Sequence, residues 1–297
     1  FKGKDKDFDF QKAYNPYDFS GLRACEARVW SFFRTFDKSM DKYKKHIMGD
    51  ASEEPMPLYI IPDRKVSLAD VREGMRNHYE GTELSMTNDP GAGVYKVPYR
   101  WRPMTFKSEG REYFNERAIA TQQTGFVLIA QMRSWLPDAI GGILWFGVDD
   151  ANTAVLTPMY TSITEIPECY RRGNGSMTEF SWTSAFWIHN WVANMAYNRY
   201  EPMIRDIRPV QKELEDSYVD LVKNTDAKAL ELLKSSPAQA TAYLTEVCGK
   251  VANEATARWK KLGEYLLVKY MDGNVKKEKD GKFEENGYGQ IVSPNFP

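Results

Sequence analysis

The sequence lacks several features that mark whole classes of protein. Its three cysteines, Cys25, Cys169 and Cys248, are odd in number and widely spaced, which argues against a disulfide framework, and no CxxC metal-binding motif is present. No apolar run reaches the roughly 18 residues of a membrane-spanning helix, so we predict no membrane span. An excess of one charge is also missing, with 40 Lys and Arg against 41 Asp and Glu. Because nucleic-acid-binding proteins normally show a basic excess, we expect no nucleic-acid partner.

What is present indicates a folded globular protein. Hydrophobic residues make up 42% and aromatic residues 13% of the 297 residues, enough to bury a sizeable core. We expect one domain over residues 1–272 and an extended tail over residues 273–297. The chain starts with Phe1 rather than Met, so we expect it to be the C-terminal part of a larger protein. The compartment stays open between the cytoplasm and the periplasm or exterior of a bacterium, and a homo-oligomer is compatible with the sequence.

Three short apolar segments follow one another in the middle of the chain. They are Phe126–Arg133, Ile143–Val148 and Ala154–Leu156. Turn-forming residues separate them, first Pro137 with Gly141 and Gly142, then Asp149, Asp150 and Asn152. Such segments predict adjacent antiparallel strands of one sheet. Because their apolar residues are nearly continuous rather than alternating, we expect both faces of the sheet to be covered.

Helices are predicted on both sides of these strands. One apolar helix face is expected from the spacing of Leu22, Cys25, Val29, Phe32, Phe33 and Phe36. Residues 182–200 are apolar almost all round, which predicts a buried helix. Residues 209–233 predict a long helix with a break at residues 224–226, and Ser236 followed by Pro237 predicts the start of another. The C-terminal third should therefore be helical.

Several motifs also carry a family resemblance. The central ones are Gln123–Phe126, Gln131–Pro137 and Trp145–Ala151. Others are Cys25–Trp30, Pro62–Lys65, His78–Thr82, Pro98–Pro103 and Ser184–Trp187. In this order, from about Tyr14 to about Asp272, they resemble the C69 family of dipeptidases, which belongs to the N-terminal-nucleophile hydrolases. The resemblance implies an α+β fold of helix, sheet, sheet and helix layers, with antiparallel strands in the middle of the chain.

The same resemblance implies a cysteine-type amidohydrolase that cleaves dipeptides or short peptides through an acyl-enzyme. In that family the nucleophile is a cysteine at the mature N-terminus, and its own α-amino group is the base. This chain starts with Phe1-Lys2-Gly3, so the nucleophile is expected upstream of Phe1, and no catalytic residue is assigned within the chain. The chain alone should be inactive, with the missing N-terminal segment as its partner. Neither a metal nor an organic cofactor is expected. The alternative is a non-catalytic peptide- or glycan-binding module, favoured by eight Trp and an aromatic loop.

The candidate substrate-binding residues are Arg133, Gln131, Trp135 and Asn190. Arg133 ends the first predicted strand, where a guanidinium can hold a substrate carboxylate through two hydrogen bonds. The alternative for Arg133 is an ion pair with a structural acid such as Asp149 or Asp150. Gln131 shares its strand face, and Trp135 follows in the adjoining loop.

Asparagines recur four residues apart on the predicted buried helix, as Asn190, Asn194 and Asn198. Buried amides need partners, so they either bond to nearby backbone or line a polar pocket. Asp149 and Asp150 predict a turn rather than a metal site, because adjacent carboxylates on a strand end point apart.

Cys25 and Cys248 lie on apolar helix faces and are expected to be buried and unreactive. The alternative for Cys25 is a papain-like nucleophile partnered by His46, His78 or His189. Cys169 has no local partner in the sequence.

Overall fold

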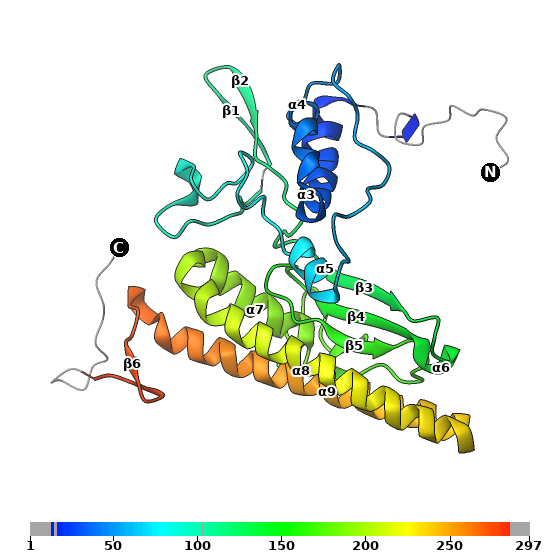
Figure 1. Cartoon of the computed structure of the whole chain (residues 1–297). Coiled ribbons are helices and arrows are strands. Elements are labelled where there is room, and N and C mark those ends of the chain that lie inside the picture. The colour runs from blue at the N-terminus through cyan, green and yellow to red at the C-terminus, as the bar shows by residue number, and fades with distance from the viewer. Residues whose placement is uncertain (1–12, 15–16, 103, 286–297) are drawn as a thin grey trace, which may run out of the picture. The chain divides into compact units, whose positions relative to one another are not determined.

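The computed structural model describes residues 13–14, 17–102 and 104–285 (Figure 1). The chain divides into two compact units. The first consists of the described residues up to Ala92 together with Pro98–Thr121, and the second consists of Gly93–Val97 and the described residues from Gln122 onwards. The single domain expected over residues 1–272 stays a prediction.

The first unit contains short helices and one hairpin. Its elements are α2 (Phe19–Gly21), η1 (Leu22–Glu26), α3 (Ala27–Phe36), η2 (Lys38–Tyr43), α4 (Lys44–Ile47), α5 (Leu68–Met75), η3 (Pro90–Ala92), β1 (Thr105–Ser108) and β2 (Arg111–Phe114). Its core includes Trp30, Tyr43 and Tyr79. Helix α5 begins with a capping box, in which the side chains of Ser67 and Asp70 each accept a hydrogen bond from the other's backbone amide.

The apolar stripe predicted for the first helix is displaced. Residues Leu22–Glu26 form a π-helical turn before α3, and this wider turn rotates the residues before it relative to those after it. Leu22 and Trp30 are buried, whereas Val29 is 39% exposed and Cys25 is only half-buried. The prediction that Cys25 is buried is therefore wrong.

The second unit is built around a three-stranded antiparallel sheet. Its strands are β3 (Phe126–Met132), β4 (Gly142–Val148) and β5 (Thr157–Tyr160), in the order β3-β4-β5. The first two predicted strands and the antiparallel order of the sheet are confirmed. The predicted position of the third, Ala154–Leu156, is wrong, because β5 begins only at Thr157. Strand β5 contains Pro158, and an edge strand tolerates proline because one of its sides needs no amide donor.

Long helices cover one face of this sheet (Figure 1). They are α7 (Ala185–Asn198), α8 (Tyr200–Ser235) and α9 (Pro237–Lys269), and the smaller elements of the unit are α6 (Asp138–Gly141), η4 (Glu168–Tyr170), η5 (Met271–Gly273), β6 (Glu278–Lys279) and β7 (Lys282–Phe283). Helix α9 begins after Ser236, whose side chain accepts from the Gln239 amide, as predicted. The antiparallel strands in mid-chain and the helical C-terminal part confirm a layered α+β fold.

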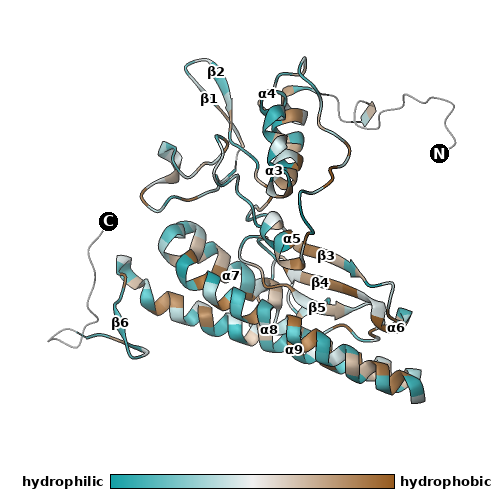
Figure 2. Ribbon diagram, viewed as in Figure 1, coloured by the Kyte–Doolittle hydropathy of each residue, from teal (hydrophilic) through white to brown (hydrophobic). Residues whose placement is uncertain are grey.

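The opposite face of the sheet is partly exposed. Phe126, Leu128 and Met132 are 62%, 42% and 61% exposed, whereas the intervening Val127 is 3% exposed. Strand β3 therefore alternates between more exposed and less exposed positions, whereas β4 and β5 have no exposed residue. The ribbon of the sheet is largely apolar (Figure 2). We predicted that both faces of the sheet are covered. Among the described residues this prediction is wrong for β3.

The predicted break at residues 224–226 does not occur, because α8 runs without interruption through them. Thr225 is 1% exposed, and the Asp226 carboxylate accepts a hydrogen bond of 2.7 Å from the Tyr160 hydroxyl. Tertiary contacts thus override the weak helix propensity of this tripeptide. In the part of the chain that the structure describes, no helix combines the length and the apolar character needed to cross a membrane.

Candidate functional site

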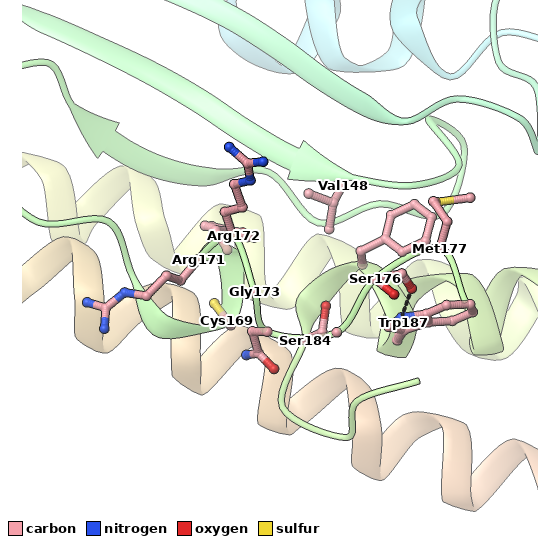
Figure 3. A pocket seen from close by; sticks show the side chains of 13 residues that line it. Val148, Cys169, Arg171, Arg172, Gly173, Ser176, Met177, Ser184 and Trp187 are labelled. Atoms are coloured by element: carbon pink, nitrogen blue, oxygen red, sulfur yellow. Dashed lines mark hydrogen bonds between the residues drawn. The ribbon is translucent and has the colours of Figure 1, made fainter. Parts of the chain in front are cut away.

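A cavity of about 500 Å³ lies where the end of β4 meets the loop of residues 171–177 and the start of α7 (Figure 3). Two glycines allow the backbone of this loop to adopt positive φ angles. Gly173 and Gly175 have φ values of 93° and 79°, which favour glycine. The Trp187 indole on α7 donates a hydrogen bond of 3.0 Å to the Ser176 carbonyl. The loop is thereby attached to the helix beside the cavity.

The first turn of α7 has no side-chain cap. Ser184 is the N-cap residue, yet its hydroxyl makes no capping hydrogen bond. Its side chain lines the cavity, and the residue is 5% exposed. The amides of Ala185, Phe186 and Trp187 also have no acceptor within the described residues. Such groups attract an acceptor because the start of a helix carries partial positive charge.

The charged side chains that line this cavity are both arginines. Arg171 forms an ion pair of 3.0 Å with Glu168. Arg172 has no ion-pair or hydrogen-bond partner in the part of the chain that the structure describes, and no acidic residue is among the described residues that line the cavity. In Figure 3 the side chains of Arg171 and Arg172 extend in different directions, and both lead away from Ser184. Both arginines are exposed to solvent.

A buried carboxylate lies directly after Val148. Asp149 has a φ of 68°, a left-handed conformation that Asp adopts more readily than most residues. Burial raises the pKa of Asp149 to about 7, with a smaller contribution from the neighbouring Asp150 and an opposing one from Asn190. Asn190 donates a hydrogen bond of 2.9 Å to Asp149 Oδ1, whereas Asp149 Oδ2 has no partner among the described residues.

Hydrogen bonds between side-chain amides continue along α7 from Asn190. Asn194 Nδ2 donates to the carbonyl and to the side chain of Asn190 at 2.8 and 3.0 Å. Gln122 donates to Asn194 Oδ1 at 3.0 Å, and Asn198 donates to the Asn194 carbonyl at 2.7 Å. Bonding to nearby backbone is thus confirmed for Asn194 and Asn198, while Asn190 holds the buried acid.

Asp150 has the turn role that was predicted. Its Oδ2 accepts hydrogen bonds of 2.9 Å from the amide and the hydroxyl of Thr153, and its Oδ1 accepts one of 3.0 Å from Tyr197. Across residues 13–14, 17–102 and 104–285, no group of three or more His, Cys, Asp or Glu side chains is placed to hold a metal ion.

Arg133 lies in a different part of the unit. Its guanidinium pairs with Asp226 of α8 and donates hydrogen bonds of 2.6 and 3.3 Å to the carbonyls of Ile140 and Gly141. The residue is 7% exposed. The geometry favours the structural interpretation, but the predicted partners Asp149 and Asp150 were wrong, because the acid is supplied by Asp226.

The other candidates do not form one site with Asn190. Gln131 accepts a hydrogen bond of 2.9 Å from the Trp145 indole, and Trp135 is 76% exposed in the loop after β3. Phe126 pairs with Val148 at the end of the sheet where Asn190 lies. About 20 Å of strand separates this end of the sheet from Arg133. A dipeptide spans at most about 7 Å, so one bound dipeptide cannot contact both ends.

The cysteines are spread over both units. Cys169 lines the cavity, and burial raises its pKa above the ordinary value. Cys248 is 1% exposed, as predicted, and burial raises its pKa to about 11. Cys25 has the Arg28 guanidinium 3.9 Å from its sulfur. No cysteine–histidine hydrogen bond occurs in the described part of the chain.

His189 is also buried. It stacks on Trp259 with ring centroids 5.3 Å apart, and burial lowers its pKa to about 4.

Sequence reasoning missed Arg172 and Ser184. Ser184 opens one of the motifs that carry the family resemblance, and the glycines beside Arg172 indicate a shaped loop between the sheet and the helix. Those two signals could have found the site.

Comparisons with known proteins agree on one family. The sequence model of peptidase family C69 matches residues 1–213. The chain is 26% identical over 270 residues to "Probable dipeptidase B" of Lactococcus lactis, which covers 88% of the chain and 50% of that protein. It is 26% identical over 245 residues to "Probable dipeptidase" of Latilactobacillus sakei, covering 76% of the chain and 46% of that protein. It is 27% identical over 154 residues to "Probable dipeptidase" of Salmonella dublin, covering 52% of the chain and 30% of that protein.

The chain thus spans about half the length of the first two of these relatives. Because the family match extends over most of its residues, the chain belongs to peptidase family C69.

Proposed function

We propose that this chain contributes the substrate-binding part of a cysteine dipeptidase. The observation that carries the proposal is the family match, together with relatives that bear the name dipeptidase. The cavity beside α7 supports it, because about 500 Å³ lies within the range of pockets that hold small ligands. Apolar side chains such as Val148, Met177 and Phe186 line it next to polar groups.

The proposed chemistry is acyl transfer through a thiolate. A cysteine thiolate attacks the scissile carbonyl, the leaving amino acid departs with a proton, and water hydrolyses the acyl-enzyme. Cys169 and Cys248 are poor candidates because burial raises the pKa of each thiol. Cys25 has no histidine bonded to it among the described residues. We therefore place the nucleophile on a cysteine outside these 297 residues, and expect the chain alone to lack peptidase activity.

The test is whether the full-length protein hydrolyses dipeptides, which is measured by the release of free amino acids. A triple variant with Cys25, Cys169 and Cys248 changed to Ser should keep most of the activity. Mass spectrometry of the wild type during turnover should locate the acyl group on a cysteine other than these three. Labelling of Cys25 or Cys169, with loss of activity on its substitution alone, would contradict this assignment of the nucleophile. A full-length protein that cleaves no peptide would sink the peptidase proposal itself.

A binding module is the second candidate, and an aromatic cluster near the cavity favours it. Trp182 is 52% exposed; its ring centroid lies 4.6 Å from that of Phe180 and 5.4 Å from that of Trp191. The Lys260 ammonium lies 5.0 Å from the Trp182 centroid. Exposed aromatic rings of this kind bind peptides and sugars through their faces. Binding of a peptide or oligosaccharide by the full-length protein, without hydrolysis and with loss on Trp182→Ala, would favour this candidate.

A further inference from the structure

We infer that strand β3 (Phe126–Met132) docks a strand from the part of the protein that lies outside these 297 residues. The added strand pairs with the free backbone edge of β3, and apolar side chains beside it pack on the open face. Strand β3 thereby becomes an inner strand of a larger sheet in the full-length protein. The inference adds a docking surface to the proposed function and holds whether or not the protein cleaves peptides.

The hydrogen bonds at the two ends of β3 fix which way its backbone faces. The Asp149 amide donates a bond of 3.0 Å to the Gly125 carbonyl, and the Arg133 amide donates one of 2.9 Å to the Gly141 carbonyl. Hydrogen-bonded and non-hydrogen-bonded pairs alternate along an antiparallel ladder. Every second residue from position 125 to position 133 therefore points its amide and carbonyl towards β4. The residues between them point theirs away from β4, and these are Phe126, Leu128, Ala130 and Met132.

This outward edge is free among the described residues, in which β3 pairs with β4 alone. The pairing is continuous from Phe126 to Met132, so no bulge interrupts the edge. The strand also contains neither proline nor a charged residue. Soluble proteins usually protect an edge strand with at least one of these features, because free amides and carbonyls attract another strand. An edge without them is typical of a strand that is covered.

The open face of β3 carries the same residues as its free edge. Side chains alternate along a strand, so the four residues with outward amides also project onto one face. All four are apolar and exposed. The Phe126 ring stacks on Phe146 of β4 with centroids 6.1 Å apart, so the apolar surface continues onto the next strand. One covering segment can therefore complete the hydrogen bonds of the edge and bury this apolar row.

The occupant is a segment of the same polypeptide rather than a second copy. The match covers 50% and 46% of the relatives from Lactococcus lactis and Latilactobacillus sakei, so a stretch of comparable length accompanies it in those proteins. A seven-residue strand is about 24 Å long, too short to bury the roughly 800 Å² per partner of a stable complex. A segment tethered in the same chain needs no such area, because its effective concentration at the edge is high.

Amide hydrogen exchange in the full-length protein tests the edge. The amides of Leu128 and Ala130 point away from β4, whereas those of Val127 and Ile129 point towards it and serve as the internal control. If a strand is added to β3, all four amides should exchange at similarly slow rates. Outward amides that exchange at least about a hundredfold faster than the inward ones would show a free edge and overturn the inference.

A photo-crosslinking amino acid in place of Leu128 identifies the occupant. In the full-length protein it should form a cross-link within one molecule, to a peptide outside these 297 residues, with a yield that does not depend on protein concentration. A cross-link to a second copy or to a residue among these 297 would overturn the inference, as would no cross-link at all. The same amino acid in place of Leu267, which is 52% exposed on α9, is the control and should give little cross-linked product.

Lysine variants of the same two leucines give an independent measurement. Leu128 and Leu267 are 42% and 52% exposed, so both Leu128→Lys and Leu267→Lys should be nearly neutral if β3 stays open. If β3 is covered, Leu128→Lys buries a lysine without a partner and should lower the unfolding midpoint of the full-length protein by about 5 °C or more. Leu267→Lys should lower it by about 1 °C or less.

The outcomes separate this inference from the proposed function. Small and equal shifts for the two lysine variants would overturn the inference. A Leu128→Lys protein that fails to fold beside a folded Leu267→Lys protein would support it, and the exchange rates and the cross-link are measured without that variant. Peptide hydrolysis enters none of these measurements, so a full-length protein that cleaves no dipeptide would refute the proposed function and leave the docked strand standing.

Discussion

Asn190 of α7 donates a hydrogen bond of 2.9 Å to the carboxylate of Asp149, the residue that follows β4. This bond joins the sheet to the helix whose first turn lines the cavity. The remaining Asp149 oxygen is buried without a partner among the described residues. An ionised carboxylate is therefore only partly compensated, which is why burial raises the pKa of Asp149 to about 7.

The first prediction concerns stability against pH. Because the pKa of Asp149 is raised in the folded state, the folded protein holds this proton while the unfolded chain loses it near pH 4. The stabilising contribution is full below about pH 4 and is lost as the pH rises through about 7. Asp149→Asn should remove this dependence, since Asn also tolerates a left-handed φ and can still accept from Asn190. The variant should gain stability at pH 8, by on the order of 4 kcal/mol at most.

Urea unfolding at pH 4 and at pH 8 measures this difference. His189 has an opposite effect in part of the same window, because its pKa is lowered to about 4 by burial and its contribution is lost as the pH falls from about 6.5. Both proteins contain His189, so subtracting one from the other isolates Asp149. An Asp149→Asn variant that is equally destabilised at both pH values would show that the carboxylate is not strained by burial.

The second prediction concerns the buried ion pair of Arg133 and Asp226. Arg133→Gln leaves Asp226 without its cation in a position of low exposure, which should lower the free energy of unfolding by about 3–5 kcal/mol. Arg171→Gln breaks the exposed pair with Glu168 and should cost about 1 kcal/mol or less. Chemical denaturation of both variants gives the comparison. A stable Arg133→Gln protein that no longer prefers a dipeptide over its amide would instead support Arg133 as a substrate ligand.

The third prediction ranks the thiols by reactivity. Cys25 is half-buried, whereas Cys169 and Cys248 are buried. With its pKa raised to about 11, the Cys248 thiol is about 0.1% ionised at pH 8, against about a quarter for an ordinary thiol. A chromogenic thiol reagent should therefore label Cys25 first in the native protein, and Cys25→Ser should remove that fast phase. Equal rates for all three thiols are expected only in denaturant.

The fourth prediction concerns the loop beside the cavity. Trp187→Phe keeps an aromatic ring but removes the 3.0 Å hydrogen bond to the Ser176 carbonyl. The loop should lose its attachment to α7, so KM for a dipeptide should rise by several-fold while kcat changes less. The cost in folding free energy should be about 1 kcal/mol. Trp135→Phe, at an indole that is 76% exposed, is the control and should leave KM unchanged.

The parts of the fold that could be predicted are those with local signals. The strands at Phe126 and Ile143 are apolar runs between turn residues, and the start of α9 has Ser236 directly before Pro237. The continuity of α8 through Asp226 had no such signal, because the contacts that hold it come from Tyr160 and Arg133, which lie 66 and 93 residues away in sequence. Cys25 was misplaced for another reason, since a periodicity argument assumes 3.6 residues per turn throughout.

Some residues of the candidate site could likewise be predicted from local sequence signals, and others could not. Asn190 could be singled out because amides are unusual on an otherwise apolar helix. Its partner Asp149 was assigned to the turn, because burial of that carboxylate depends on how β4 and α7 pack. No sequence motif around Arg172 indicated that it lines a cavity. Its significance comes from having no partner, and only a structure that shows where Glu168 lies can tell it apart from Arg171.

The connection between α8 and α9 affects how this unit folds. These helices of 36 and 33 residues are joined by Ser236 alone and run side by side (Figure 1). Closing so short a loop costs little chain entropy, and contacts between neighbouring helices are local in sequence. We expect this helical hairpin to form early, on the timescale of microseconds to milliseconds, and to offer a surface onto which β5 docks. The C-terminal helices would then form before the strands that precede them in the sequence.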